Sequence, residues 1–240
     1  MRTAIAALTF AATFLPHAPA DAAPRSHGED PSSVPSASSA RALPPITVSV
    51  YVAPHVPQST VTRLLAEAAD VWRPNGITFL WVPGPEEVAP YGRAGEDGRY
   101  RPSTLRVSID YERGDPRRDR LTPLGWIRFD RPGEPDQVIH VSYANATSLL
   151  EASALVVGPV GTMPKLEREL YLARAMGRAL AHELGHYLLA SKVHTVHGLM
   201  QAGRTAGELF GRERVHFELD AAQKEVALSR LMQTMTLTRR

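Results

Sequence analysis

The segment His182-Glu183-Leu184-Gly185-His186 contains the residue types and the spacing that metal-assisted hydrolysis requires. In a helix, residues four apart lie on one face with about 5–6 Å between their Cβ atoms. His182 and His186 can therefore each present a ring nitrogen to one ion at about 2.0–2.1 Å. Glu183 lies one position round from the first imidazole, so we expect it to act as a base toward water and not as a ligand. The competing interpretation is an ordinary amphipathic helix with surface or core histidines.

The residues around this segment favour the metal site. Apolar side chains recur every three or four positions and predict a long buried helix from about Lys165 to about Ala190, directly after Pro164. These apolar residues are Leu166, Leu170, Ala173, Met176, Leu180, Leu184 and Leu188. Two histidines and a glutamate inside such a helix would be costly to bury without a role. The sequence therefore predicts a zinc site on this helix.

A catalytic zinc usually takes a third protein ligand and leaves a fourth position for water. If the helix continued, His194 would lie about 12 Å along the axis from His186, too far to share an ion. We therefore expect the chain to leave the helix soon after Leu189. On the residues alone the third ligand is His194, His197 or a downstream acid, of which Glu208 is best placed, although an exposed acid is the simpler interpretation of Glu208.

The stretch HELGHYLLASKVHTVHGLM, residues 182–200, resembles the zinc helix, third histidine and methionine turn of the metzincin metalloproteases. The usual pattern HExxHxxGxxH would place glycine at 189 and histidine at 192, where this chain has Leu189 and Lys192. The match is to a variant with longer spacing, similar to bacterial exported metzincin-like proteins. The resemblance implies that His194 is the third ligand, with His197 as the alternative, and that Met200 forms the floor of the site.

The same resemblance implies an α+β fold of the zincin type: a twisted mixed sheet with an antiparallel edge strand over the HExxH helix. It implies a zinc-dependent metalloendopeptidase in which Glu183 activates water. The edge strand, at Gly125, Trp126 and Ile127, would align a peptide or protein substrate, whereas the simpler interpretation of Trp126 is a core residue. The alternatives are a secreted zinc-binding pseudoenzyme and a hydrolase of other amides or esters.

The sequence before this helix predicts a strand, a helix and a second strand. Residues 46–52 alternate and are β-branched, residues 61–72 have helical spacing up to Pro74-Asn75-Gly76, and residues 77–82 are again apolar. Such a unit implies a parallel pair with a right-handed crossover. Further strands are expected over 105–109, 124–129 and 137–142, with a connection over 131–135. His140, on the last of these strands, is expected to be a core or surface residue.

The N-terminal end of the chain predicts a secreted or periplasmic location. Arg2, the apolar-rich run from Ala4 to Leu15 and the small residues after it are typical of a signal peptide over 1–22. Residues 23–45 are rich in Ser, Pro and Ala, which indicates a disordered linker or a propeptide. The catalytic domain is then expected over 46–233, where Asp220 and Gln223 cap a final helix, and a tail over 234–240.

Composition excludes several classes of protein. The formal net charge is +2 and the basic residues are not clustered, so nucleic acid is a poor candidate partner. No cysteine is present, which excludes a disulfide framework and a cysteine latch on the zinc. The apolar run near the N-terminus is too short to span a bilayer, which takes about 20 residues. We expect a monomer without stable membrane insertion once the signal peptide is cleaved.

Overall fold

The predicted strand, helix and strand open the fold in the computed structural model, which describes residues 43–84, 105–114 and 123–238. They are β1 (Ile46–Val52), α1 (Gln58–Trp72) and β2 (Phe79–Pro83). A short 3-10 turn, η1 (Arg73–Asn75), ends in Gly76, whose φ of 76° favours glycine. β1 and β2 pair in parallel, with Ile46 opposite Phe79, which confirms the predicted parallel pair.

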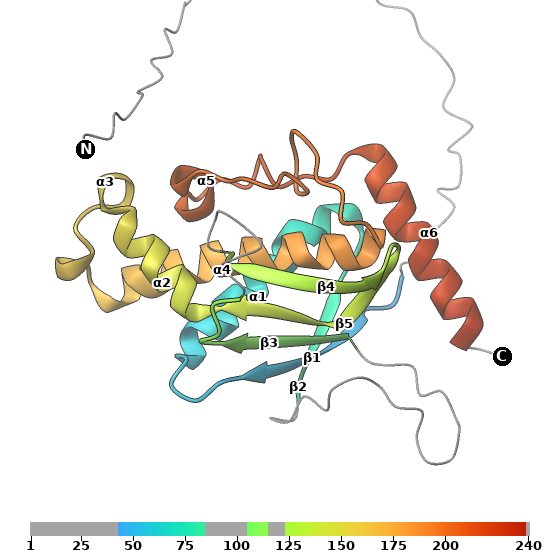
Figure 1. The fold of residues 1–240 in the computed structure, drawn as a ribbon, viewed down its shortest axis with the longest axis horizontal. Coiled ribbons are helices and arrows are strands. Elements are labelled where there is room, and N and C mark those ends of the chain that lie inside the picture. Colours follow the sequence, from blue (N-terminus) through green and yellow to red (C-terminus); the bar gives the residue numbers. More distant parts are fainter. Residues whose placement is uncertain (1–42, 85–104, 115–122, 239–240) are drawn as a thin grey trace, which may run out of the picture. The chain divides into compact units, whose positions relative to one another are not determined.

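The five described strands form one mixed sheet in the order β2-β1-β3-β5-β4. β3 (Leu105–Asp110) pairs in parallel with β1 and with β5 (Glu134–Ser142). β4 (Gly125–Arg131) pairs antiparallel with β5 and is an edge strand. The fold is therefore α+β with a mixed sheet that has an antiparallel edge (Figure 1).

The connection between β4 and β5 is shorter than the sequence predicted. The two strands extend toward each other until Arg131 lies opposite Glu134, so only Pro132 and Gly133 remain between them. Gly133 has a φ of 80°, the positive value that the second central residue of a Pro-Gly type II turn adopts. The expected loop over 131–135 was therefore wrong, because the glycine allows a tight turn.

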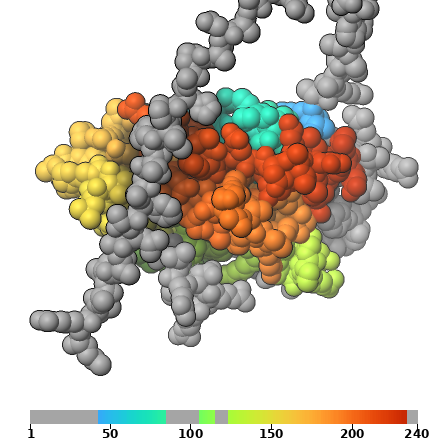
Figure 2. All heavy atoms as spheres, turned by 90° about the horizontal axis from the view of Figure 1, so that it is seen from above, coloured from blue at the N-terminus to red at the C-terminus, as the bar shows by residue number. Residues whose placement is uncertain are grey.

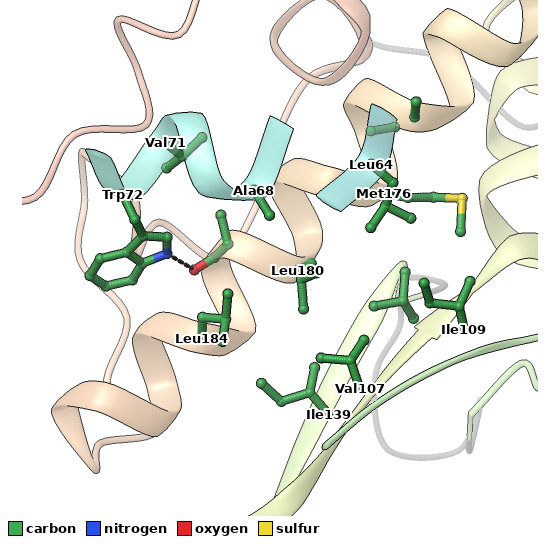
Figure 3. Packing of buried hydrophobic residues seen from close by; sticks show 14 of the residues in the cluster. Leu64, Ala68, Val71, Trp72, Val107, Ile109, Ile139, Met176, Leu180 and Leu184 are labelled. Atoms are coloured by element: carbon green, nitrogen blue, oxygen red, sulfur yellow. Dashed lines mark hydrogen bonds between the residues drawn. The ribbon is translucent and has the colours of Figure 1, made fainter. Parts of the chain in front are cut away.

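The long helix that carries the HExxH segment is α4 (Lys165–Leu189), close to its predicted bounds. It lies between α1 and the sheet, and its apolar side chains meet both layers (Figure 3). Figure 3 shows Met176, Leu180 and Leu184 of α4 between α1 residues and the sheet residues Val107, Ile109 and Ile139. A buried hydrogen bond joins the two helices, since the indole Nε1 of Trp72 donates to the carbonyl of Ala181 at 3.1 Å. This packing fixes the helix just before His182.

The described part of the chain also contains elements that were not predicted, among them α2 (Tyr143–Ala152), α3 (Ala154–Val157), η2 (Val160–Thr162) and α5 (Ala206–Phe210). The Ser142 hydroxyl caps α2 by accepting a hydrogen bond from the N–H of Asn145. α2 follows β5 without a break, so the strand pattern obscured its start.

The final helix, α6 (Ala221–Thr238), begins at the predicted capping box. The backbone N–H of Gln223 donates to Asp220 Oδ1 at 2.7 Å, and the backbone N–H of Asp220 donates to Gln223 Oε1 at 3.2 Å. The helix continues past the expected domain boundary at 233. α6 (red) and the segment between α4 and α6 (orange to red) share the face seen in Figure 2.

The predicted signal peptide over 1–22, and all but the last three residues of the linker over 23–45, lie outside the described residues. Within the described part of the chain, no helix is both long enough and apolar enough to cross a membrane.

Candidate metal centre

Three imidazoles converge at the C-terminal end of α4. His182 and His186 share one face of the helix, and the loop that follows brings back His194. The ring centroids are 4.6 Å apart for His182 and His186, 5.3 Å for His182 and His194, and 4.9 Å for His186 and His194. One ring nitrogen from each histidine lies within 4.8 Å of the other two. The structure thus brings the three predicted ligands together.

The chain leaves α4 at Ala190, as the spacing required. Ala190 adopts the left-handed conformation with a φ of 46°, and the N–H of Ser191 donates to the His186 carbonyl at 3.2 Å. This reversal turns the backbone toward the metal-binding face. His194, four residues later, is exposed and lies across the two helix imidazoles.

Backbone carbonyls orient both helix imidazoles. Nδ1 of His182 lies 2.8 Å from the Leu199 carbonyl, and Nδ1 of His186 lies 2.6 Å from the Ser191 carbonyl. A carbonyl can only accept, so each Nδ1 carries the proton and each Nε2 keeps its lone pair for a metal.

Both of these imidazoles are neutral at neutral pH. Burial, and to a smaller extent the neighbouring His186, lower the pKa of His182 to about 3. Burial also lowers the pKa of His186. Metal ligation requires deprotonated ring nitrogens, so this electrostatic environment fits a cation at the three imidazoles.

Met200 packs beneath the helix. It is fully buried, and a Cβ on Gly185 would collide with its sulfur atom, so the glycine allows the close approach. The turn that carries Met200 is held on its other side, where the Leu199 amide donates to the Glu218 carbonyl at 2.7 Å. The same Leu199 orients His182 through its own carbonyl. Met200 therefore packs against the turn of α4 that lies between His182 and His186.

Glu183 follows His182 on α4 but is not a member of the three-histidine cluster. Burial raises the pKa of its carboxyl to about 8, against a hydrogen bond from the Ile127 amide, which lowers it. The neighbouring strand comes very close at Gly125, where a Cβ would lie 3.1 Å from Glu183 Cγ and 3.1 Å from the His140 carbonyl. A buried carboxyl with a pKa near neutrality can take up and release a proton under working conditions.

The three predicted substrate-binding residues lie along β4 with different surroundings. Gly125 faces α4, and the Ile127 amide is already bonded to Glu183. Trp126 lies between them in an alternating strand and so faces the opposite side of the sheet, where its ring stacks on His140 at 5.0 Å. Trp126 is half-buried on the face of the sheet that points away from α4. It does not pack into the core between the sheet and α4.

Sequence reasoning missed Phe129, which also borders the metal centre. Its ring meets the His186 ring edge-on, with centroids 6.5 Å apart, and Lys192 Nζ lies 5.1 Å from the centre of the Phe129 ring. The period of two along β4 could have indicated this residue, because it falls on the same face as Gly125 and Ile127.

The alternative ligands lie elsewhere in the described part of the chain. His197 is exposed and is not a member of the three-histidine cluster. Glu208 belongs to a capping box with Thr205 at the start of α5 and forms an ion pair with Arg204 at 3.3 Å. Its carboxylate therefore has a structural role.

No protein-family model matches this chain, and no curated protein matches it. The chemistry of the site follows from its own donor set: three imidazoles, of which His182 and His186 are neutral, suit zinc and related transition metals.

Proposed function

We propose that this protein is a zinc-dependent endopeptidase of the metzincin-like kind. The observation that carries the proposal is the position of Glu183, which follows His182 on α4, is buried and is hydrogen-bonded to the edge strand β4. Three imidazole ligands with an open fourth position are typical of catalytic zinc, whereas structural sites usually complete four protein ligands. A histidine cluster serving only the fold would not require a buried proton acceptor beside it.

The residues present fit Zn²⁺ because the His182 and His186 imidazoles are neutral and bond through Nδ1, and within the described residues no other bond to their Nε2 atoms is found. When bound there, Zn²⁺ would lower the pKa of a water molecule and polarise the carbonyl under attack. Glu183 would accept the proton that the attacking water loses and return it to the leaving amine. The Ile127 amide keeps the Glu183 carboxylate pointed at the site during this exchange.

The edge position of β4 supports an extended peptide as the substrate. β5 covers only one side of β4, and an edge strand can accept a further strand through its main-chain groups. The Ile127 amide is occupied by Glu183, so a substrate would pair with other main-chain groups of β4. Phe129 would lie against substrate residues close to the cut bond, since it already contacts His186.

The first test replaces the proposed base, Glu183→Gln. We expect zinc binding and folding to persist, because the side chain is not a ligand, and peptide cleavage to fall by about 10²–10⁴-fold. Zinc content and digestion of a peptide library by the zinc-loaded protein measure both. The matched control is Glu225→Gln on the exposed side of α6, which should cleave normally. Undiminished cleavage by Glu183→Gln would overturn the mechanism; cleavage of esters but not peptides would change the substrate class.

The second test separates the candidate third ligands. His194→Ala should lose most of the zinc affinity, since a two-histidine site lacks the usual three ligands. His197→Ala should keep one zinc at this site, because His197 lies outside the cluster. Equilibrium dialysis against Zn²⁺ distinguishes the two variants. The reverse result would reassign the ligand and alter the course of the loop.

A further inference from the structure

A second group of metal-binding side chains lies on the other face of the sheet. It consists of Asp110 at the end of β3, Glu112 just beyond it, and His140 on β5. His140 pairs with Ser108 across the two strands, and the alternate residues Ile109 and Ile139 are fully buried toward the helices. The side chains of Asp110 and His140 therefore face away from α4, on the side of the sheet opposite the three-histidine centre.

His140 has an unsatisfied ring nitrogen. Its Nδ1 is buried and has no hydrogen-bond partner in the described part of the chain. The nearest carboxylate oxygen, Asp110 Oδ2, lies 3.9 Å away, which is too far for a hydrogen bond. Stacking on Trp126, with an angle of 4° between the rings, fixes the plane of the imidazole. A buried polar atom without a partner requires an explanation, and an ion between the two side chains supplies one.

Asp110 is held in place and still has capacity for a cation. Its Oδ2 accepts a hydrogen bond from Ser108 Oγ at 2.7 Å, and its Oδ1 accepts one from the Glu112 amide at 2.8 Å. Each carboxylate oxygen has two lone-pair sites, so one site on each remains. The Glu112 side chain also lies close to Asp110 and His140.

We propose that Asp110, Glu112 and His140 bind a divalent transition-metal cation of the zinc class. Their donor atoms lie within 4.8 Å of one another, and tetrahedral zinc would need them about 3.4 Å apart at its usual bond lengths. Rotation of the exposed Glu112 side chain, together with a small shift of Asp110 Oδ2 toward His140 Nδ1, which now lie 3.9 Å apart, can close this difference. The imidazole ligand selects against Ca²⁺ and Mg²⁺, which prefer oxygen donors.

The proposed ion would act on the strand that lines the first site. It would tie the end of β3 to β5, and the stacked Trp126 would extend that link to β4. β4 contributes Gly125 and Ile127 to the surroundings of Glu183. The proposed ion would thus help to hold β4 in position, and this proposal is independent of the reaction proposed above.

The test measures zinc stoichiometry in the full chain by equilibrium dialysis. The wild type should bind two Zn²⁺, and a variant with His182, His186 and His194 all replaced by Ala should bind one. Glu112→Gln should weaken the remaining site by at least about tenfold, as loss of metal-site groups commonly does, and His140→Ala should abolish it. His216→Ala, at an exposed histidine outside both groups, is the control and should bind like its parent.

Glu112 is exposed, so its substitution tests the site without risk to the core. If the triple variant does not fold, the same substitutions in the otherwise wild-type chain should reduce the stoichiometry from two to one. The proposal is overturned if the folded triple variant binds no zinc, if Glu112→Gln and His140→Ala bind as the parent does, or if Ca²⁺ binds in place of zinc.

Discussion

At the scale of single residues, Ala190 explains the longer spacing between His186 and the third histidine. The metzincin pattern would place a glycine at 189, but here α4 continues through Leu189 and the left-handed residue is Ala190. The helix thus ends later than the pattern implies, and His194 takes the place expected for residue 192. A non-glycine residue at this φ carries steric strain, which the surrounding packing must offset.

Ala190→Gly should therefore stabilise the protein by about 1 kcal/mol, because glycine adopts the left-handed conformation without a Cβ clash. Ala190→Val, in contrast, should destabilise it, since a β-branched residue tolerates positive φ poorly. Urea unfolding of the metal-free protein measures both. Equal stability of the two variants would mean that this residue does not keep the left-handed conformation in solution.

At the scale of elements, the distance between β4 and α4 determines where Glu183 lies. Gly125 permits the close approach, and its neighbour Ile127 donates the hydrogen bond. In the segment after α4, Arg204 donates to the Gly198 carbonyl and to Gln201 Oε1, and its guanidinium lies 4.4 Å from the centre of the Phe217 ring. These contacts stabilise the turn that carries Met200.

Gly125→Ala should impair catalysis more than metal binding. The new Cβ would press on Glu183 Cγ and on the His140 carbonyl, both 3.1 Å away, so the carboxyl or the strand must shift. A displacement of about 1 Å at a catalytic group can cost about 10²-fold in rate. We expect cleavage to fall by this order while the zinc content is retained.

Gly161→Ala is the matched control for this substitution, because a Cβ there meets no atom within 4 Å. It should leave cleavage unchanged. Loss of zinc together with activity in Gly125→Ala would show that β4 supports the ligands themselves and not the base.

At the scale of the whole molecule, a buried ion-pair network joins α1 to α4 and to the segment before α6. Glu67 Oε1 accepts from Arg178 Nε at 2.9 Å, and Glu67 Oε2 accepts from Arg214 at 2.6 Å. Arg214 also bonds Asp70 at 3.0 Å. Burial raises the pKa of Glu67, but the hydrogen bonds and charges of the two arginines outweigh it and leave that pKa below the ordinary value of 4.5.

This shift predicts how stability depends on pH. Because the folded-state pKa of Glu67 lies below its unfolded value, the network's contribution is complete above about pH 4.5 and is lost as the pH falls through the folded value. Glu67→Gln should lower stability at neutral pH by about 3–5 kcal/mol, since it leaves Arg178 buried without its charge partner. Its stability should then fall less steeply than that of the wild type below pH 4.5.

Unfolding by urea at a series of pH values measures this difference, and Glu225→Gln, at an exposed position on α6, should follow the wild type. Parallel pH profiles for the wild type and Glu67→Gln would contradict the role of the network.

The sequence by itself determined the features that depend on local spacing. The i, i+4 histidines, the bounds of α4, the opening strand, helix and strand, and the capping box at Asp220 all follow from interactions within a few residues, so their patterns are readable. The predicted zinc, peptidase activity and export rest on the same patterns and on the metzincin resemblance, and they stay predictions.

Only the tertiary structure decided which distant residues meet. It placed His194 in the cluster and not His197, because the path of the loop depends on the turn at Ala190 and on the packing of Met200 beneath Gly185. The tertiary structure also placed the Ile127 amide where it donates a hydrogen bond to Glu183. The pairing of β3 with β5 brought Asp110 beside His140. These contacts depend on the order of strands in the sheet and on close approach of backbones, and such long-range contacts leave no periodic signal in a single sequence.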